Sequence, residues 1–102
     1  MLKVKVAKSF FSRLRGLIGK NYLPRGEGLL IAPCSSIHTC FMKFNIDAIF
    51  IDKNFVIKKI VLNLKTWRGF AMCLDAWAVV EVAAGVANNL NVGDKLEVVF
   101  CD

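Results

Sequence analysis

The only histidine of the chain, His38, lies in a stretch that also holds two of the four cysteines, Cys34 and Cys40. If this stretch is extended, alternate residues share one face of a strand. That face then carries thiols, a hydroxyl, an imidazole and a thioether, from Cys34, Ser36, His38, Cys40 and Met42. This row of soft donors and polar groups is unusual for a plain core. We therefore predict that the stretch forms the wall of a site.

Nucleophilic catalysis is one chemistry that these residue types could support. Cys34 or Ser36 would be the nucleophile, His38 the general base, and Asp47 the group that orients the imidazole. However, the sequence shows no nucleophile elbow and no helix N-terminus that could stabilise an oxyanion. A hydrolase-type enzyme is therefore an alternative, and the sequence leans against catalysis.

A soft-metal site is the second chemistry, with Cys34, His38 and Cys40 binding zinc, or with Met42 added for copper(I). Structural zinc sites commonly use two cysteines in a tight turn, and this chain has no CxxC pair. These three residues are therefore weak metal ligands, and we expect neither a metal nor another cofactor.

Binding without chemistry is the function we favour, with an unknown small molecule or a peptide as the ligand. An apolar pocket with a few convergent polar groups is the usual form of such a site. The residues we expect to contact the ligand are Ser36, His38, Thr39, Met42, Asp47, Trp67 and Phe70. The competing interpretation is structural: a lone histidine is commonly a hydrogen-bonded core residue, and Asp47 could fix a loop through backbone N–H groups.

Positive charge is concentrated at the start of the chain. The net charge is +6, and the first 25 residues hold seven basic side chains and no acidic one. Arg13, Arg15 and Lys20 could therefore bind an anion or nucleic acid. Phe10 and Phe11 fit a buried helix stripe better than a stacking surface, which makes nucleic acid an unlikely partner.

The elements that must position these residues follow from hydrophobic periodicity. Apolar residues at helical spacing predict one N-terminal amphipathic helix, and residues 84–90 predict a short helical turn. Residues 46–62 predict a β-hairpin around a turn at 52–54, and residues 63–75 predict a loop. Further strands are expected at residues 2–6, 29–32, 76–82 and 95–101, with mid-strand Glu81 facing solvent. The expected fold class is α+β, with about six mostly antiparallel strands curled into a small barrel.

Composition sets the remaining limits. The chain has 102 residues, which fits a single domain spanning residues 1–102. Apolar residues make up 56% of it, but its apolar runs are far shorter than the roughly 18 residues that a membrane-spanning helix needs. The lysines near the start interrupt any signal-peptide core, so we expect a cytoplasmic protein with free thiols.

An ordered set of short motifs resembles an uncharacterised bacterial and archaeal family, catalogued as domain of unknown function 192. The matching residues are Arg15-Gly16-Leu17, Pro33-Cys34, Ser36-Ile37-His38-Thr39, Met42, Ile46-Asp47, Phe50, Asp52, Val80-Glu81-Val82, Ala84-Gly85 and Gly93-Asp94. They span about residues 7–99. The resemblance implies a small β-rich domain with an open barrel-like core, and it implies no established activity. Cys40 lies outside this pattern. The family usually has a glycine in the turn after the strand at 47–52, where this chain has Asn54-Phe55.

Overall fold

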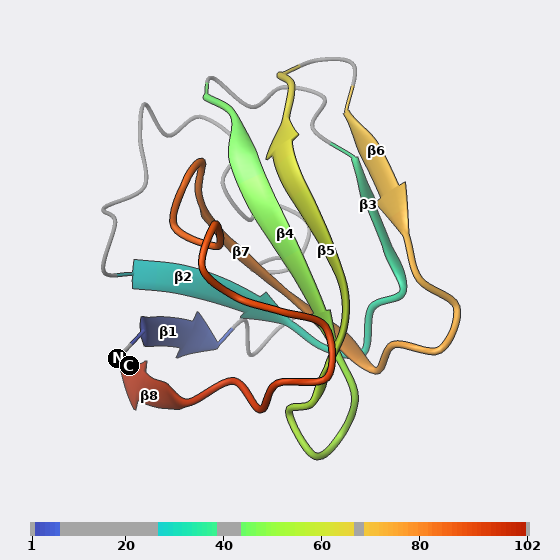
Figure 1. Ribbon diagram of the computed structural model, residues 1–102, viewed down its shortest axis with the longest axis vertical. Helices are drawn as coiled ribbons and strands as arrows, with labels where there is room; N and C mark the ends of the chain where they lie inside the picture. The colour runs from blue at the N-terminus through green and yellow to red at the C-terminus, as the bar shows by residue number, and fades with distance from the viewer. Residues whose placement is uncertain (1, 7–26, 39–43, 67–68, 102) are drawn as a thin grey trace.

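The computed structural model describes residues 2–6, 27–38, 44–66 and 69–101. Within these residues, the strands form one sheet of six and a separate pair (Figure 1). The strands are β1 (Leu2–Val6), β2 (Glu27–Ile31), β3 (Ser36–His38), β4 (Ile46–Ile51), β5 (Ile57–Leu64), β6 (Phe70–Met72), β7 (Ala78–Ala83) and β8 (Val98–Cys101). The larger sheet has the order β5-β4-β7-β2-β1-β8, and β3 pairs with β6.

The larger sheet is mixed. Its strand β1 lies between β2 and β8 and runs parallel to both. The pairs β2–β7, β4–β7 and β4–β5 are antiparallel, as is β3–β6. The first and last strands of the chain are therefore neighbours, and the two ends of the chain lie side by side in Figure 1.

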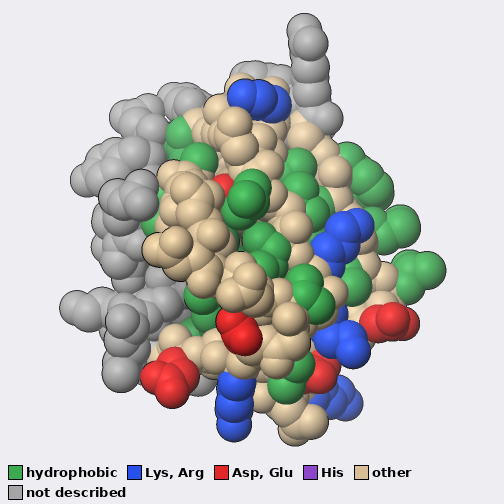
Figure 2. Space-filling model, in the orientation of Figure 1, with side chains coloured by type: hydrophobic (Ala, Val, Ile, Leu, Met, Phe, Trp, Pro, Cys, Tyr) green, Lys and Arg blue, Asp and Glu red, His purple; other side chains and the backbone are tan. Residues whose placement is uncertain are grey.

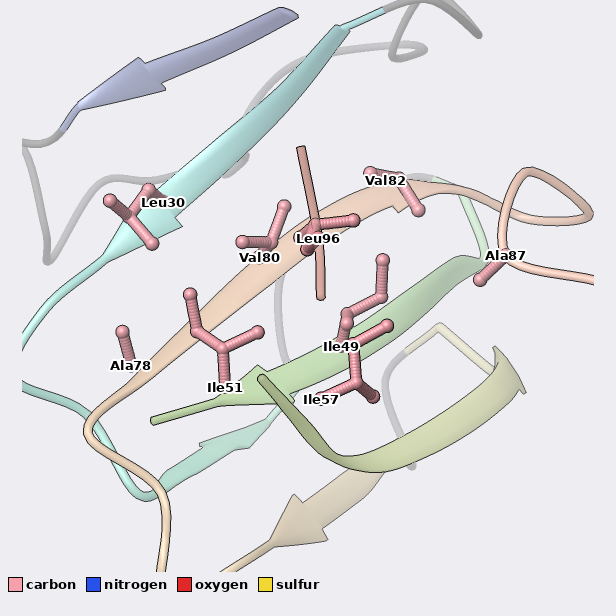
Figure 3. Packing of buried hydrophobic residues seen from close by; sticks show 9 residues of the cluster. All are labelled: Leu30, Ile49, Ile51, Ile57, Ala78, Val80, Val82, Ala87 and Leu96. Atoms are coloured by element: carbon pink, nitrogen blue, oxygen red, sulfur yellow. The ribbon is translucent and has the colours of Figure 1, made fainter. Parts of the chain in front are cut away.

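Both faces of the sheet are covered at its centre, and for this reason every residue of β4 is buried. On one face, alternate residues of β2, β4 and β7 pack with residues from β5 and from the loop after β7 (Figure 3). This first cluster consists of Leu30, Ile49, Ile51, Ile57, Ala78, Val80, Val82, Ala87 and Leu96. On the opposite face, Ile37 of β3 and Ala71 of β6 pack onto the intervening residues. This second cluster consists of Ile31, Ile37, Ile46, Ala48, Phe50, Leu64, Ala71 and Val79.

The predicted hairpin is confirmed: β4 and β5 pair antiparallel around a turn that begins at Asp52. The backbone N–H of Phe55 donates to the carbonyl of Asp52 (3.0 Å), which closes the turn. Phe55 has a φ of 64°, in the region that favours glycine, and it replaces the glycine expected in this turn from the family resemblance. Its ring packs against Trp77 at a centroid distance of 6.1 Å, so burial of the ring offsets the backbone strain.

The predicted fold class is wrong in two respects. The described residues form two separate open sheets instead of one sheet curled into a small barrel, and they contain no helix. Residues 84–90 form successive turns, with hydrogen bonds from Val86, Asn88 and Leu90 to the carbonyls three residues earlier. Gly85 and Gly93 bound this segment, and the residues between them form turns without continuing as a helix. The predicted N-terminal helix lies outside the described residues.

Gly28 of β2 lies close to the side chains and backbone of β7. A Cβ atom there would lie 3.0 Å from Val82 Cγ1 and 3.2 Å from the carbonyl oxygen of Glu81. We therefore expect Gly28→Ala to lower the free energy of unfolding by about 1–3 kcal/mol, as measured by urea denaturation.

The double variant Gly28→Ala/Val82→Ala is the matched control, because it removes the methyl group that the new Cβ would meet. Its loss should be smaller than the two single losses combined. Strict additivity of the two losses would contradict a steric origin.

Candidate functional site

An open groove of about 690 Å³ lies where three segments meet at one end of β4. A volume in this range is typical of sites that hold small ligands. The groove, called here the basal groove, is lined by Pro33, Cys34, Ser35, Asp52, Lys53, Asn54, Leu74, Asp75, Ala76 and Trp77. These residues come from the segment before β3, from the β4–β5 turn and from the segment between β6 and β7.

Backbone hydrogen bonds hold the Cys34 wall of the groove in place. The N–H of Cys34 donates to the carbonyl of Trp77 (2.8 Å), and the N–H of Cys73 donates to the carbonyl of Ser35 (2.8 Å). The Cys34 thiol donates to the carbonyl of Ser36 at 3.1 Å. Cys34 and Cys73 are half-buried and pack beside the second cluster. The Cys34 thiol is thus at the groove, but its hydrogen is directed to the backbone.

Asp52 fixes the opposite wall. Its Oδ1 accepts hydrogen bonds from the backbone N–H groups of Asn54 (2.8 Å) and Val56 (3.0 Å). The Asp52 side chain thus closes the turn through hydrogen bonds to the backbone, and Lys53 and Asn54 are exposed to solvent. The groove therefore has one basic side chain, Lys53, and two acidic ones, Asp52 and Asp75, beside the apolar surface of Leu74 and Trp77.

The two-stranded sheet brings together three residues that the sequence places in one site. Its register sets Ser36 opposite Met72 and His38 opposite Phe70. Phe70, Met72 and Leu74 are 61%, 43% and 79% exposed, whereas Ala71 between them is buried. Phe70 and Met72 on β6, with Leu74 in the turn that follows, are therefore three neighbouring apolar side chains exposed to solvent, called here the β6 stripe. Figure 2 shows apolar side chains standing out on the side of the molecule where β6 lies.

Asp47 is fully buried on the face of the first cluster and is bound to three backbone N–H groups. Its Oδ1 accepts from Asn63 (2.8 Å), and its Oδ2 accepts from Gly85 (2.9 Å) and Ala87 (3.0 Å). Asn63 lies where the β4–β5 register shifts, with a φ of 53°. One carboxylate therefore ties the irregularity in β5 to the turns after β7.

The structure does not bring Asp47 and Cys34 together. Asp47 shares its sheet face with the first cluster, because it alternates along β4 with residues of the second cluster. Cys34 packs against the second cluster, on the opposite face of the sheet. Ser36 is exposed on the two-stranded sheet that covers this opposite face. The three residues thus do not assemble as nucleophile and orienting acid.

Glu81 is buried at the centre of β7, and the prediction that it faces solvent is wrong. Its side chain is 4% exposed on the face of the second cluster, between Leu29 of β2 and Ala48 of β4. Burial raises the pKa of the Glu81 carboxyl from 4.5 to about 7. Within residues 27–38, 44–66 and 69–98, no hydrogen-bond partner contacts this carboxyl.

Several predicted site residues lie outside the described part of the chain. They are Thr39, Cys40, Met42 and Trp67 of the ligand and metal candidates, and Arg13, Arg15 and Lys20 of the anion candidates. The His38 backbone belongs to β3, but the placement of its side chain is not described.

Two searches of the described residues set limits on the site. Among them, no group of three or more His, Cys, Asp or Glu side chains could hold a metal ion. In the same part of the chain, no helix has the length and hydropathy needed to cross a membrane.

The sequence and the fold can be compared with those of known proteins. The family model DUF192, described as "Uncharacterized ACR", matches residues 1–98. The chain belongs to the DUF192 family. Its relatives include UPF0127 proteins of Pyrococcus horikoshii and Pyrococcus furiosus, which are 34% and 31% identical to it. These matches cover 93% and 94% of this chain, and 86% of each relative.

A solved structure supports the fold of this DUF192 protein. It is a protein of unknown function from Novosphingobium aromaticivorans, 20% identical, with a TM-score of 0.84. The match covers 94% of this chain and 74% of that one. The match of the family model and the two relatives confirm the family resemblance predicted from the ordered motifs.

Sequence reasoning missed most of the basal groove. The sequence predicts a loop around Leu74, a strand around Trp77 and a turn at residues 52–54, and none of these patterns indicates a groove. One signal was present: Phe70, Met72 and Leu74 alternate with smaller residues, which is typical of a strand with one exposed face.

Proposed function

We propose that this DUF192 protein is a binding module whose ligand occupies the basal groove and extends toward the β6 stripe. The single observation that supports the proposal is the continuity between the two surfaces. Leu74 lines the groove and is also the last residue of the stripe, and it is 79% exposed. A large apolar side chain held in solvent beside a groove of ligand size is typical of a binding surface.

Asp47 is not among the ligand contacts that we now propose. Both of its carboxylate oxygens already accept backbone hydrogen bonds, so Asp47 stabilises the fold. Ser36 and Phe70 stay in the proposal, because β3 and β6 adjoin two of the segments that line the groove. His38 pairs with Phe70 in the register of these strands. Lys53 and Asp75 offer charged groups of opposite sign at the groove itself.

A cytoplasmic location is also part of the proposal. It is supported by Cys73, whose thiol forms no disulfide within the described residues, as is usual in a reducing compartment.

Small apolar fragments test the groove directly. Indole or cyclohexanol, titrated into the ¹⁵N-labelled chain, should give saturable NMR shifts at the amides of Cys34, Ser35 and Trp77. Leu74→Ser should weaken fragment binding at least fivefold, since it removes about 1 kcal/mol or more of apolar contact. Leu74 is so exposed that the substitution should leave the fold intact.

Val92→Ser is the matched control. Val92 is 63% exposed in the loop before β8 and lines no part of the groove, so its replacement should leave fragment affinity unchanged. The proposal fails if no fragment shifts the groove amides, or if Leu74→Ser and Val92→Ser bind equally well.

A further inference from the structure

We infer that the ligand of this module is an extended peptide segment with apolar side chains at alternate positions, lying across the β6 stripe with one side chain in the basal groove. This inference rests on the proposed function and adds the class of partner. It is argued from the spacing of the stripe, the state of the strand edge, the available area and the charges around it.

The spacing of the stripe matches that of a peptide strand. Phe70 and Met72 stand two positions apart on β6, about 6.6 Å along the strand, and exposed Leu74 follows in the turn after β6. An extended peptide repeats its own side chains at the same interval, so two of its residues can meet Phe70 and Met72 in register, and a third can reach Leu74. A helical ligand repeats its apolar side chains every three or four residues, about 4.5–6.0 Å along its axis, which is a shorter interval than that of Phe70 and Met72.

The edge of β6 directs the peptide onto the face of the strand pair. The Cys73 N–H donates to the carbonyl of Ser35, so the N–H and carbonyl of Met72 point away from β3. The Met72 carbonyl accepts a hydrogen bond from Lys59 Nζ at 2.8 Å. This lysine occupies the edge where an added strand would pair. Recognition through side chains on the outer face is therefore favoured over addition of a strand at this edge.

The exposed area suits a short segment better than a second copy of this chain. Each of the three stripe side chains offers on the order of 100 Å² of apolar surface, so the stripe amounts to roughly 300 Å². A stable protein dimer commonly buries about 800 Å² on each partner. A peptide of a few residues can cover the stripe fully, whereas a second copy would leave most of its interface without apolar contact.

The surrounding charges also distinguish a peptide from an anionic membrane. Lys59 lies beside Met72, and Lys53 lines the groove, but the carboxylates of Asp52 and Asp75 line the same groove. A lipid surface of uniform negative charge would be repelled by these acids at the Leu74 end. A peptide can carry both signs of charge at fixed positions and can match this arrangement.

Selection from a display library of random nine-residue peptides, on the immobilised full chain, tests the inference. Enriched peptides should carry apolar residues at alternate positions. Phe70→Ser should raise the Kd of a synthetic enriched peptide at least tenfold, while fragment binding in the groove stays unchanged. Leu74→Ser should weaken both peptide and fragment binding, and Val92→Ser should change neither.

Each contrary result has a distinct meaning. The inference is overturned if no peptide is enriched, if enriched peptides lack the alternate spacing, or if Phe70→Ser binds them as well as the unaltered chain. It is also overturned if Phe70→Ser abolishes binding to phosphatidylglycerol vesicles or dissociates a dimer seen by sedimentation. In all these cases fragment binding in the groove decides the proposed function separately, because Phe70 does not line the groove.

Discussion

Glu81→Gln is expected to raise the free energy of unfolding by about 3 kcal/mol at pH 8 and to leave it nearly unchanged at pH 4. Glu81 is buried on the sheet face of the second cluster and has no hydrogen-bond partner within the described segments. Glutamine has nearly the same shape as the protonated acid, so the variant keeps the packing and removes the ionisable group.

The direction of the pH dependence follows from the raised pKa of Glu81. Below pH 4.5 the carboxyl is neutral in the folded and the unfolded chain, and no penalty arises. Between 4.5 and about 7 the unfolded chain releases the proton while the folded chain retains it, so stability is lost as the pH rises. Above this range the penalty is complete, at about 1.4 kcal/mol for each unit of the shift.

Urea denaturation followed by tryptophan fluorescence, at several pH values between 4 and 8, measures this effect. Glu97→Gln is the matched control, since Glu97 is exposed before β8 and its replacement should give no pH-dependent difference. Parallel pH curves for Glu81→Gln and the unaltered chain would show that the buried carboxyl does not govern stability.

Asp47→Ala is expected to lower the free energy of unfolding by about 3–5 kcal/mol. The substitution leaves three backbone N–H groups, those of Asn63, Gly85 and Ala87, without their acceptor. Asp47 is fully buried, so water cannot replace the carboxylate without disrupting the packing around it. Asp47→Asn should lose less, because one oxygen can still accept a hydrogen bond. This second variant keeps the prediction testable if the alanine variant does not fold.

Asp52→Ala is the matched control for Asp47. Asp52 also accepts hydrogen bonds from two backbone N–H groups, but at a turn that solvent can reach. Its removal should therefore lower the free energy of unfolding by only about 1 kcal/mol. Equal losses at the two positions in urea denaturation would refute the view that Asp47 acts as a buried tie between β4, β5 and the turns after β7.

Local features of the fold could be predicted from the sequence, but the order of the strands could not. The β4–β5 hairpin needs only a strand pattern and a turn, and both lie within about twenty residues of sequence. The parallel placement of β1 between β2 and β8 depends on pairing between distant segments, which periodicity does not encode. About six mostly antiparallel strands predict one sheet curled into a small barrel, whereas in the structure the separate β3–β6 pair covers one face of an open sheet.

The sequence singles out the stretch from Cys34 to Met42 as a candidate site, and its role in binding stays a prediction. In the structure, Cys34 and Ser35 line the groove, and Ser36–His38 form β3. The partners of that stretch come from Asp52–Asn54 and Leu74–Trp77, which meet it only through tertiary packing. The burial of Glu81 was missed because the polar character of one strand residue does not reveal that a second layer covers its face.

The placement of β1 beside β8 has a consequence for the order of events during synthesis. Leu2 pairs with Val98, so this contact closes a loop of almost the whole chain and forms slowly for entropic reasons. The hairpin of β4 and β5 can form while the ribosome is still translating the remainder. The hydrogen-bonding edge of β1 stays open until residues 98–101 emerge, and β8 covers it last. In that interval the nascent chain carries an unpaired strand edge, which is its most exposed target for aggregation or for a chaperone.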